Sequence, residues 1–404
     1  MAPRRTGGTA VSANTGPLSG IKVVDLSVMI SGPLAAMMLA DQGADVIKVE
    51  SPGIGDMMRF LGSQKGGITG IFALHNRGKK SIGLNLKSDK GRQILRDLMK
   101  DADVVIQNFR PGALEKLGFG YEDVRKFNDR IVYVSISGFG PDGPRSGQRV
   151  YDNVIQAASG LASVQTDKAT GRPQVFRTLV CDKVTSYTVA QAVTAALFAR
   201  ERGRGGQHIE ISMLDSAIAF MWPDSAMDAA LLDDDVARTP TIGENYAALE
   251  LKDGFVTVSA VSQPEFEGYC AALGNPDLAK DPRFADAAAR SANTAELRLE
   301  IKKLTDAITV EQFLANAVTF DVPASGINTL HNVHEEPQVQ HNGTFVVREH
   351  PKAGSIREAR NAPHFRGTPT SMPATAPDRG EHSDEIVASL GLDASALRAE
   401  GVIF

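Results

Sequence analysis

The sequence is poor in cysteine and has no long uninterrupted apolar run. Two cysteines among 404 residues, Cys181 and Cys270, cannot form a disulfide framework, and so low a content is typical of a reducing cytoplasm. The longest apolar pattern, Val189 to Ala199, is shorter than the roughly 20 residues that a membrane-spanning helix needs. These absences predict a cytoplasmic protein that does not associate with a membrane.

Blocks of like charge are also lacking. The formal net charge is -5 and evenly spread, so nucleic acid is not an expected partner. With 42% hydrophobic residues, the chain is long enough for two cores, because a single core stops growing at roughly 250–300 residues. We therefore expect two domains.

Short apolar strands alternate with helical patterns in the first half of the chain. Ile21 to Asp25 predicts a buried strand, Pro33 to Gln42 a helix with proline in its first turn, and Ala44 to Glu50 a second strand. The alternation continues with strands at 81–86, 104–108, 131–137 and 207–211, and with helices after Ser88, at 113–117, at 122–128 and from about Lys183. This order predicts an α/β protein with a doubly wound parallel sheet.

The pattern changes after Trp222. Residues 225–237 are rich in Ala and Asp and indicate a helix or a crossing connection, while Lys252-Asp-Gly254 predicts a hairpin. Helices are expected at 263–273, 294–307 and 310–319. The expected organisation is a disordered tail at 1–17, a large α/β domain at 18–224, a small α+β domain at 225–324 and a return to the large domain at 325–404.

Asp182 is the first candidate for chemistry. It follows an apolar stretch and precedes a helical pattern rich in small residues. A carboxylate held where water is scarce can act as a nucleophile or base, whereas the same group on an open surface is merely solvated. The position equally fits a helix N-cap, because Asp often accepts hydrogen bonds from the N–H groups of a helix start. From the residues alone both interpretations stay open.

A series of motifs, taken together and in order, identifies a family. The motifs are Gly20–Leu26, Gly43–Glu50, Gly55–Arg59, Asn76–Leu86, Ala102–Gly112, Leu117–Gly120, Ser135–Pro144, Tyr151-Asp152 and Gly203–Asp215. With them, the chain resembles the family III CoA-transferases (CaiB/BaiF), which include formyl-CoA transferase and L-carnitine CoA-transferase, and the related α-methylacyl-CoA racemases. The resemblance covers roughly Leu18 to Leu392. It implies an interlocked homodimer, each subunit threaded through the other, with CoA bound on the large domain.

Asp182 falls at the position of the family's catalytic aspartate. The resemblance implies that its carboxylate, with an ordinary pKa near about 4, attacks an acyl-CoA thioester to give a mixed anhydride. The released CoA thiolate then attacks the aspartyl carbonyl and leaves an aspartyl-CoA thioester, and an acceptor acid reverses the sequence. Acyl-CoA and a carboxylic acid are therefore the expected substrates, and neither a metal nor a tightly bound cofactor is expected.

Tyr151 distinguishes the branches of the family. Racemases have His at this position and a Glu that aligns with Gln263, and these two residues act as bases. Neither a tyrosine with a pKa near about 10 nor an amide readily removes an α-proton at neutral pH. A racemase-like isomerase is therefore the disfavoured alternative. A catalytically inactive acyl-CoA-binding protein is a third hypothesis, against which the retained Asp182 argues.

The resemblance also assigns CoA contacts. Asn108 and Phe109 match family positions that line the CoA groove, and Leu84 and Lys87 match positions beside the adenosine. Lys116 and Arg149 stand where the family has charge for phosphate contacts, and Tyr151 is a further candidate contact to CoA. Ordinary packing or a solvated surface remains an alternative for each.

Some positions depart from formyl-CoA transferase. That enzyme has Gln where Ile30 stands and Arg where Ser51 stands. Its tetraglycine loop has no counterpart here, and the nearest region reads Gly243-Glu-Asn-Tyr-Ala247. Since Ile30 cannot make a polar contact, we expect an acid that is larger or more apolar than oxalate.

Overall fold

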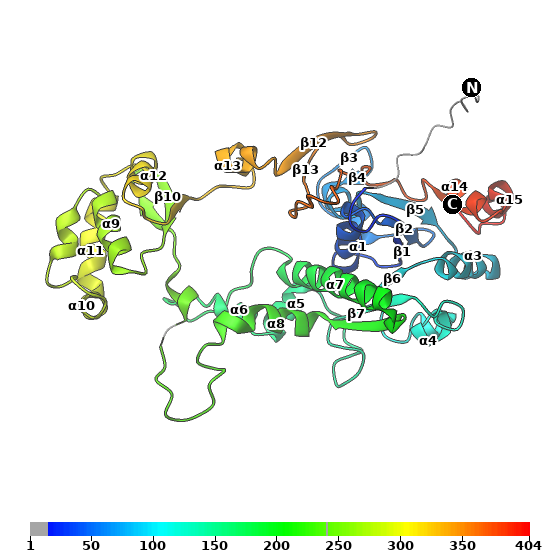
Figure 1. The fold of residues 1–404 in the computed structure, drawn as a ribbon, viewed down its shortest axis with the longest axis horizontal. Helices are drawn as coiled ribbons and strands as arrows, with labels where there is room; N and C mark the ends of the chain where they lie inside the picture. Colours follow the sequence, from blue (N-terminus) through cyan, green and yellow to red (C-terminus); the bar gives the residue numbers. More distant parts are fainter. Residues whose placement is uncertain (1–14, 240) are drawn as a thin grey trace, which may run out of the picture. The chain divides into compact units, whose positions relative to one another are not determined.

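The computed structural model describes residues 15–239 and 241–404 (Figure 1), so the expected tail at 1–17 lies almost wholly outside the described residues. Contacts within the chain define two compact units, one formed by Met1–Ala226 with Gly343–Phe404 and the other by Met227–Asn342. Over the described ranges, no helix is both long and apolar enough to cross a membrane.

The first unit is built on a six-stranded sheet in which every neighbouring pair of strands is parallel. Its strands are β1 (Lys22–Asp25), β2 (Asp45–Glu50), β5 (Lys79–Gly83), β6 (Val104–Gln107), β7 (Val132–Ser137) and β8 (Gln207–Ser212). The spatial order is β5-β2-β1-β6-β7-β8, so the winding direction reverses between β1 and β6. In open α/β sheets, ligands bind at the carboxyl ends of the strands beside such a reversal. The predicted parallel α/β sheet is confirmed.

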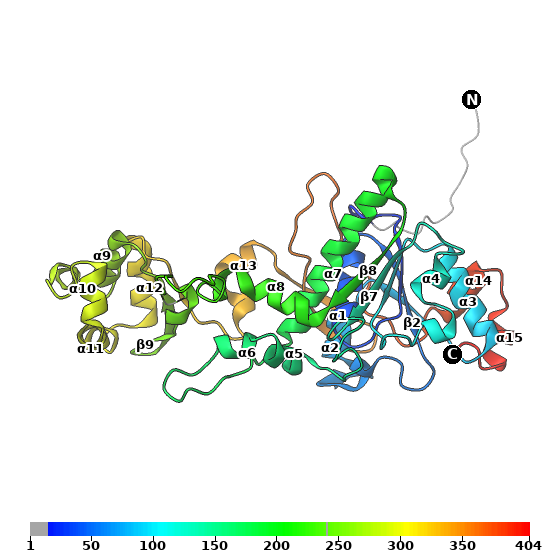
Figure 2. The same ribbon diagram turned by 90° about the horizontal axis from the view of Figure 1, so that it is seen from below.

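Helices cover both faces of this sheet because successive strand residues point to opposite sides. On one face, α1 (Ser31–Asp41), α7 (Val180–Ala199) and α8 (Met213–Ser225) pack on a core that includes Val104. On the other, α3 (Asp89–Lys100), α14 (Ser383–Ser389) and α15 (Ala394–Ala399) pack on a core that includes Val105. Figure 2 shows α3, α14 and α15 to the right of the sheet and α1 and α7 to its left.

Local signals explain several helix starts. The predicted cap at Ser88 is present, since its hydroxyl accepts from the Gly91 N–H at 3.0 Å. Helix α1 begins at Ser31, earlier than expected, with Pro33 in its first turn. No helix follows α8 between Ser225 and 239, where the sequence left a helix or a connection open. Shorter helices of this unit are α2 (Gly70–Asn76), α4 (Tyr121–Val124), α5 (Asp152–Ala158) and α6 (Leu161–Val164).

The second unit is α+β. Its antiparallel sheet has the order β11-β10-β9, with β9 (Leu249–Leu251) and β10 (Gly254–Val258) forming the predicted hairpin. Because β11 (Ala324–Gly326) pairs with β10, the chain is still in this unit at residue 325 and returns to the first unit at Gly343, later than expected. The helices of this unit are α9 (Gln263–Ala272), α10 (Ala287–Ala292), α11 (Thr294–Thr305), α12 (Val310–Thr319) and α13 (Pro337–His341).

The returning segment adds a hairpin of β12 (Phe345–His350) and β13 (Gly354–Ala359) to the first unit. A two-strand pair of β3 (Gln64–Lys65) and β4 (Ile68–Thr69) precedes α2. Single helical turns lie at Met57–Phe60, Glu115–Leu117, Arg200–Arg204, Ile242–Asn245, Pro276–Lys280 and Val333–Glu335.

Candidate active site

A cavity of about 410 Å³ opens at the carboxyl ends of β1, β6 and β7, beside the reversal of the sheet. Its lining comes from the segments that follow these strands and from the start of α7. These segments contribute Val28, Met29 and Ser31 after β1, Asn108 to Pro111 after β6, Ile136 to Gly138 at the end of β7, Ser146 and Gln148 to Tyr151 in the next loop, Asp182 from α7 and Met213 from α8. The sheet topology thus brings the candidate nucleophile to the place where this fold binds ligands.

Asp182 lies within the first turn of α7 and is not its N-cap. The helix begins at Val180, and the capping position is Leu179, whose side chain makes no capping bond. The Asp182 carboxylate instead lines the cavity, together with Ser31, the first residue of α1. The capping interpretation is therefore wrong, and the carboxylate is available at the cavity.

Burial and, to a smaller extent, the negative charge of Asp152 raise the pKa of Asp182 to about 7, while hydrogen bonding by Ser31 acts in the opposite direction. The sequence suggested an ordinary pKa near about 4. At neutral pH the group is therefore divided between acid and carboxylate. A carboxylate with so high a pKa is more basic than a solvated one, which favours nucleophilic attack.

Asp152, the first residue of α5, fixes the backbone at Asp182. It is 3% exposed, and one of its oxygens accepts from the Asp182 N–H at 2.9 Å. The other accepts from the Gln156 side chain at 2.6 Å, which in turn accepts from the Phe176 N–H at 2.7 Å. Within residues 15–239 and 241–404 Asp152 forms no ion pair, so its charge acts on Asp182 without a neutralising cation.

The adjacent thiol does not compete with the carboxylate. Cys181 is fully buried, and burial, with the charges of Asp152 and Asp182, raises its pKa to about 12. A thiol with this pKa stays protonated at neutral pH and is a poor nucleophile.

Of the residues assigned to CoA, four share the cavity with Asp182: Asn108, Phe109, Arg149 and Tyr151. The Asn108 side-chain amide holds the loop after β1 through two hydrogen bonds to Val28. It accepts from the Val28 N–H at 2.9 Å and donates to the Val28 carbonyl at 2.7 Å. Phe109 and Tyr151 are exposed at 37% and 69%, so their rings are free to contact a ligand. The sequence did not single out Ser31 or Arg110, which also line the cavity.

The other three assigned residues lie elsewhere in the first unit. Leu84 is fully buried in the core under α3, and its backbone bridges to Ile403. Lys87 is exposed just before α3, and Lys116 is exposed in the turn at Glu115–Leu117. None of the three lines the cavity.

Ile30 does not take part in the cavity either. It is 2% exposed and packs with Met58, Ile68 and Phe72. Its side chain therefore points into a hydrophobic cluster, and the argument from Ile30 against a small dicarboxylic acid has no structural basis.

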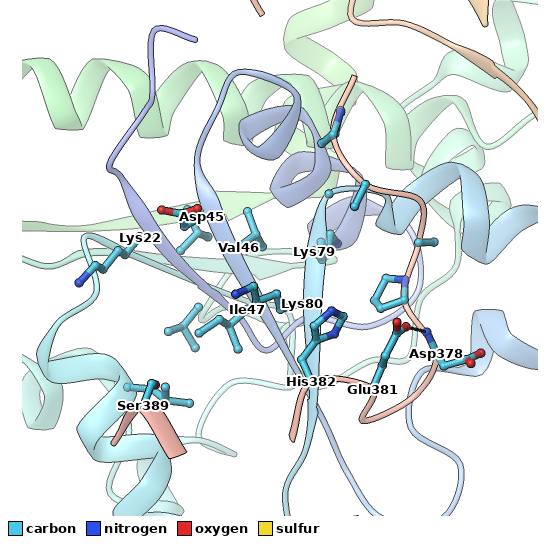
Figure 3. A pocket seen from close by; sticks show the side chains of 18 of the residues that line it. Lys22, Asp45, Val46, Ile47, Lys79, Lys80, Asp378, Glu381, His382 and Ser389 are labelled. Atoms are coloured by element: carbon cyan, nitrogen blue, oxygen red, sulfur yellow. Dashed lines mark hydrogen bonds between the residues drawn. The ribbon is translucent and has the colours of Figure 1, made fainter. Parts of the chain in front are cut away.

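A second cavity of about 720 Å³ lies at the amino ends of β1, β2 and β5, under residues 373–378 (Figure 3). Two of its lysines are paired with carboxylates, Lys22 with Asp101 and Lys80 with Glu385 at 2.5 Å. Ligands of this fold bind at the opposite ends of the strands. The smaller cavity is therefore the candidate active site. Throughout the described ranges, no three His, Cys, Asp or Glu side chains gather as metal ligands.

Comparisons with known proteins identify the family of the chain. The model of CoA-transferase family III matches residues 18–383. Succinate–glutarate CoA-transferase of Agrobacterium fabrum is 35% identical over 384 residues, which cover 93% of this chain and 96% of that protein. Formyl-CoA:oxalate CoA-transferase of Escherichia coli is 30% identical over 401 residues, covering 93% and 96%. A CAIB/BAIF family protein from Brucella suis has a similar structure, with a TM-score of 0.82 at 31% identity, covering 93% of this chain and 100% of that one.

Proposed function

The chain belongs to CoA-transferase family III, and on this basis we propose that it moves CoA from an acyl-CoA donor to a carboxylic acid through covalent intermediates on Asp182. One observation carries the proposal: a single carboxylate with a raised pKa faces the cavity at the switch point of the sheet. Its relatives' names describe CoA-transferases, so the chain is a transferase enzyme.

The proposed first step uses the ionised carboxylate. An Asp182 oxygen attacks the thioester carbonyl carbon, the carbon–sulfur bond breaks and CoA leaves as thiolate, giving a mixed anhydride. The thiolate then attacks the Asp182 carbonyl carbon and expels the first carboxylate, leaving an aspartyl-CoA thioester. The acceptor carboxylate repeats these steps in reverse, so no electrons are exchanged with a redox partner.

The surroundings of Asp182 support this sequence of steps. Partial burial limits the access of water, to which both acyl intermediates are sensitive. The thiolate, still part of a bound CoA, returns at high effective concentration. Arg110 and Arg149 line the same cavity and supply positive charge for the thiolate or for ligand phosphates.

We place the pantetheine of CoA along Phe109, Arg149 and Tyr151, beside the Asn108 that holds the loop after β1. Lys87 and Lys116, both exposed, are the proposed contacts for the distant phosphates, with the backbone beside Leu84 near the adenosine. For the transferred acids we propose short dicarboxylates, because the relatives act on succinate, glutarate or oxalate and a second carboxylate can pair with Arg110.

We further propose the interlocked homodimer and the cytoplasmic location that the family resemblance implies. Large apolar side chains are exposed on α7 and α8 of the single chain, among them Tyr187 at 65%, Phe198 at 68% and Phe220 at 57%. An exposed apolar surface of this kind favours burial against a partner subunit. Sedimentation velocity at micromolar concentration tests the dimer, and a single-chain mass would contradict it.

Chemical trapping tests the covalent mechanism. The enzyme is incubated with succinyl-CoA and then with hydroxylamine or borohydride, and modified peptides are mapped by mass spectrometry. We expect modification at Asp182, and Asp182→Ala should abolish transfer while leaving CoA affinity within about threefold. The exposed Asp142 provides a matched control as Asp142→Ala. Trapping at another residue, or appreciable turnover by Asp182→Ala, contradicts the mechanism, and deuterium incorporation at the α-carbon favours the racemase alternative.

A further inference from the structure

The loop at residues 27–31, which follows β1, forms one wall of the candidate active site. Val28, Met29 and Ser31 line the cavity together with Asp182. Met29 has a φ of 64°, a left-handed conformation that a residue with a side chain adopts only when its surroundings impose it. Such conformations are concentrated at functional sites. The groups that impose this one therefore bear on how the site works.

Two buried residues of opposite charge hold the 27–31 loop. Lys48, in β2, donates to the Ser27 carbonyl at 2.8 Å. Asp56, in the segment after β2, accepts from the Met29 N–H at 3.1 Å. The Lys48 Nζ and the Asp56 Oδ2 form an ion pair at 2.9 Å, with side chains that are 1% and 0% exposed. Because water screens so deeply buried a pair very little, the pair holds the loop firmly on both sides of Val28.

The ion pair lies behind the loop and not in the cavity. Neither Lys48 nor Asp56 is among the described residues that line the cavity. The Asp56 Oδ1 also accepts from the Met58 N–H at 3.0 Å, and the Lys48 Nζ lies 3.9 Å from the second carboxylate, that of Asp25. A ligand in the cavity does not reach the pair, so its influence on the reaction passes through the loop.

The loop in turn contacts the helix that carries the nucleophile. The Ser186 hydroxyl on α7 lies 2.8 Å from the Ser31 carbonyl oxygen and 2.9 Å from the Asp182 carbonyl oxygen, and its single hydrogen is shared between them. The loop also packs closely on the start of α1, because a Cβ at Gly32 would lie 2.3 Å from the Ser27 Cβ. A displacement of the loop therefore alters the wall of the cavity and the first turn of α7 together.

We propose that Lys48 and Asp56 are positioning residues for the reaction at Asp182, an inference that rests on the proposed function. Their ion pair keeps the 27–31 loop in its left-handed conformation, and the loop holds the acyl-CoA thioester within reach of the carboxylate. A displacement of about 1 Å at a reacting group can cost about 100-fold in rate. Loss of the pair should therefore slow the chemical step, whereas affinity for CoA depends on contacts elsewhere in the cavity.

The test variant is Asp56→Asn. One oxygen of Asp56 faces the N–H groups of Met29 and Met58, and the other faces the Lys48 ammonium group. The amide NH₂ of asparagine opposes a donor in either orientation, so the arrangement cannot be kept. Thioester formation on Asp182 is measured in a single turnover with succinyl-CoA, or with the donor that an acid panel identifies. We expect a rate about 100-fold lower, with half-saturation by the donor within about threefold of wild type.

Asp41→Asn is the matched control. Asp41 and Arg77 form another buried ion pair, at 2.6 Å with side chains 3% and 4% exposed, and Asp41 does not line the active-site cavity. Arg77 keeps a second carboxylate, Glu358 at 4.0 Å, much as Lys48 keeps Asp25 at 3.9 Å. Both variants should lose thermal stability, because each leaves a buried cation without its nearer partner. Measured well below both melting temperatures, Asp41→Asn should retain the wild-type rate within about threefold.

Hydrogen exchange separates positioning from a general loss of stability. Peptides that cover residues 26–33 should exchange faster in Asp56→Asn than in wild type, and at the wild-type rate in Asp41→Asn. A merely structural role would lower the melting temperature of both variants without distinguishing their rates or the exchange of this loop. If Asp56→Asn does not fold, Asp56→Ser keeps an acceptor for the Met58 N–H and still removes the carboxylate that holds Met29.

The outcomes distinguish this inference from the function on which it rests. If Asp182 of the wild-type enzyme is not the residue trapped, the covalent mechanism itself fails. If Asp182 is trapped but the Asp56 variant reacts as fast as the Asp41 control, only the positioning role is overturned. A slower reaction without faster exchange at residues 26–33 also overturns it, because the effect then does not pass through the loop.

Discussion

Replacing Asp182 with Asn should stabilise the folded protein at neutral and alkaline pH while removing activity. The pKa of Asp182 is raised from 3.8 to about 7 by burial and by the charge of Asp152. At about 1.4 kcal/mol for each pH unit between these values, keeping the group ionised in the fold costs at most roughly 4 kcal/mol. Water at the cavity mouth screens part of this, so we expect about 2–4 kcal/mol for the variant at pH 8.

The sign of the pH dependence is fixed by the direction of the shift. Between pH 3.8 and about 7 the folded state holds the proton of Asp182 more tightly than the unfolded chain does. The wild-type protein therefore loses stability as the pH rises through this window, and Asp182→Asn does not share this loss. The stability difference should be small near about pH 4 and should reach its full size above about pH 7.

Urea unfolding at a fixed protein concentration, followed between about pH 4.5 and 8.5, measures this difference. Asp142→Asn, at an exposed position, is the matched control and should track the wild type at every pH. A difference between Asp182→Asn and wild type that is constant with pH would refute the reasoning, because a constant gain cannot arise from proton binding. A variant less stable than wild type at pH 8 would do the same.

Three further outcomes are expected. Asp152→Asn keeps an acceptor for the Asp182 N–H but loses the charge that raises the pKa of Asp182, so the acid limb of kcat/KM should move to lower pH with a change in plateau below about tenfold. Lys79→Met removes the nearer of the two lysines that pair with the fully buried Asp25, at 2.8 Å, and leaves Lys48 at 3.9 Å. We expect the free energy of unfolding to fall by about 3–5 kcal/mol in urea titrations. Arg149→Gln should raise KM for acyl-CoA about tenfold and change kcat less than threefold. A tenfold change corresponds to the loss of about 1.4 kcal/mol of binding free energy, as expected for one contact to a phosphate. An unchanged KM would show that Arg149 does not contact CoA.

The parallel sheet could be predicted from the sequence because it depends on strong periodic signals. Buried strands such as 104–107 are continuous apolar runs, and the helix after Ser88 has both a cap and an amphipathic pattern. The candidate nucleophile could also be predicted, because Asp182 stands in a distinctive segment that resembles a family motif. These features are local in the sequence.

The immediate surroundings of Asp182 could not be predicted in the same way. Whether Ile30 or Ser31 faces the cavity depends on the left-handed turn at Met29, which no composition signal announces. The contact between Asp152 and the Asp182 N–H joins two helices 30 residues apart, and the raised pKa of Asp182 follows from that contact and from burial. Only Ser31-Gly-Pro33, in the segment that follows the predicted strand at Ile21 to Asp25, offered a signal of a helix start at the site.

The division of the first unit into two separate stretches of chain has a consequence for its biosynthesis. All six strands of the large sheet have been synthesised by residue 212, but one face of that sheet is completed by Ile386, Val387, Leu397, Val402 and Ile403. Until these residues are synthesised, one face of the sheet lacks part of its apolar covering. That face of the sheet therefore stays incompletely covered for the whole time in which the intervening residues 227–342 are translated.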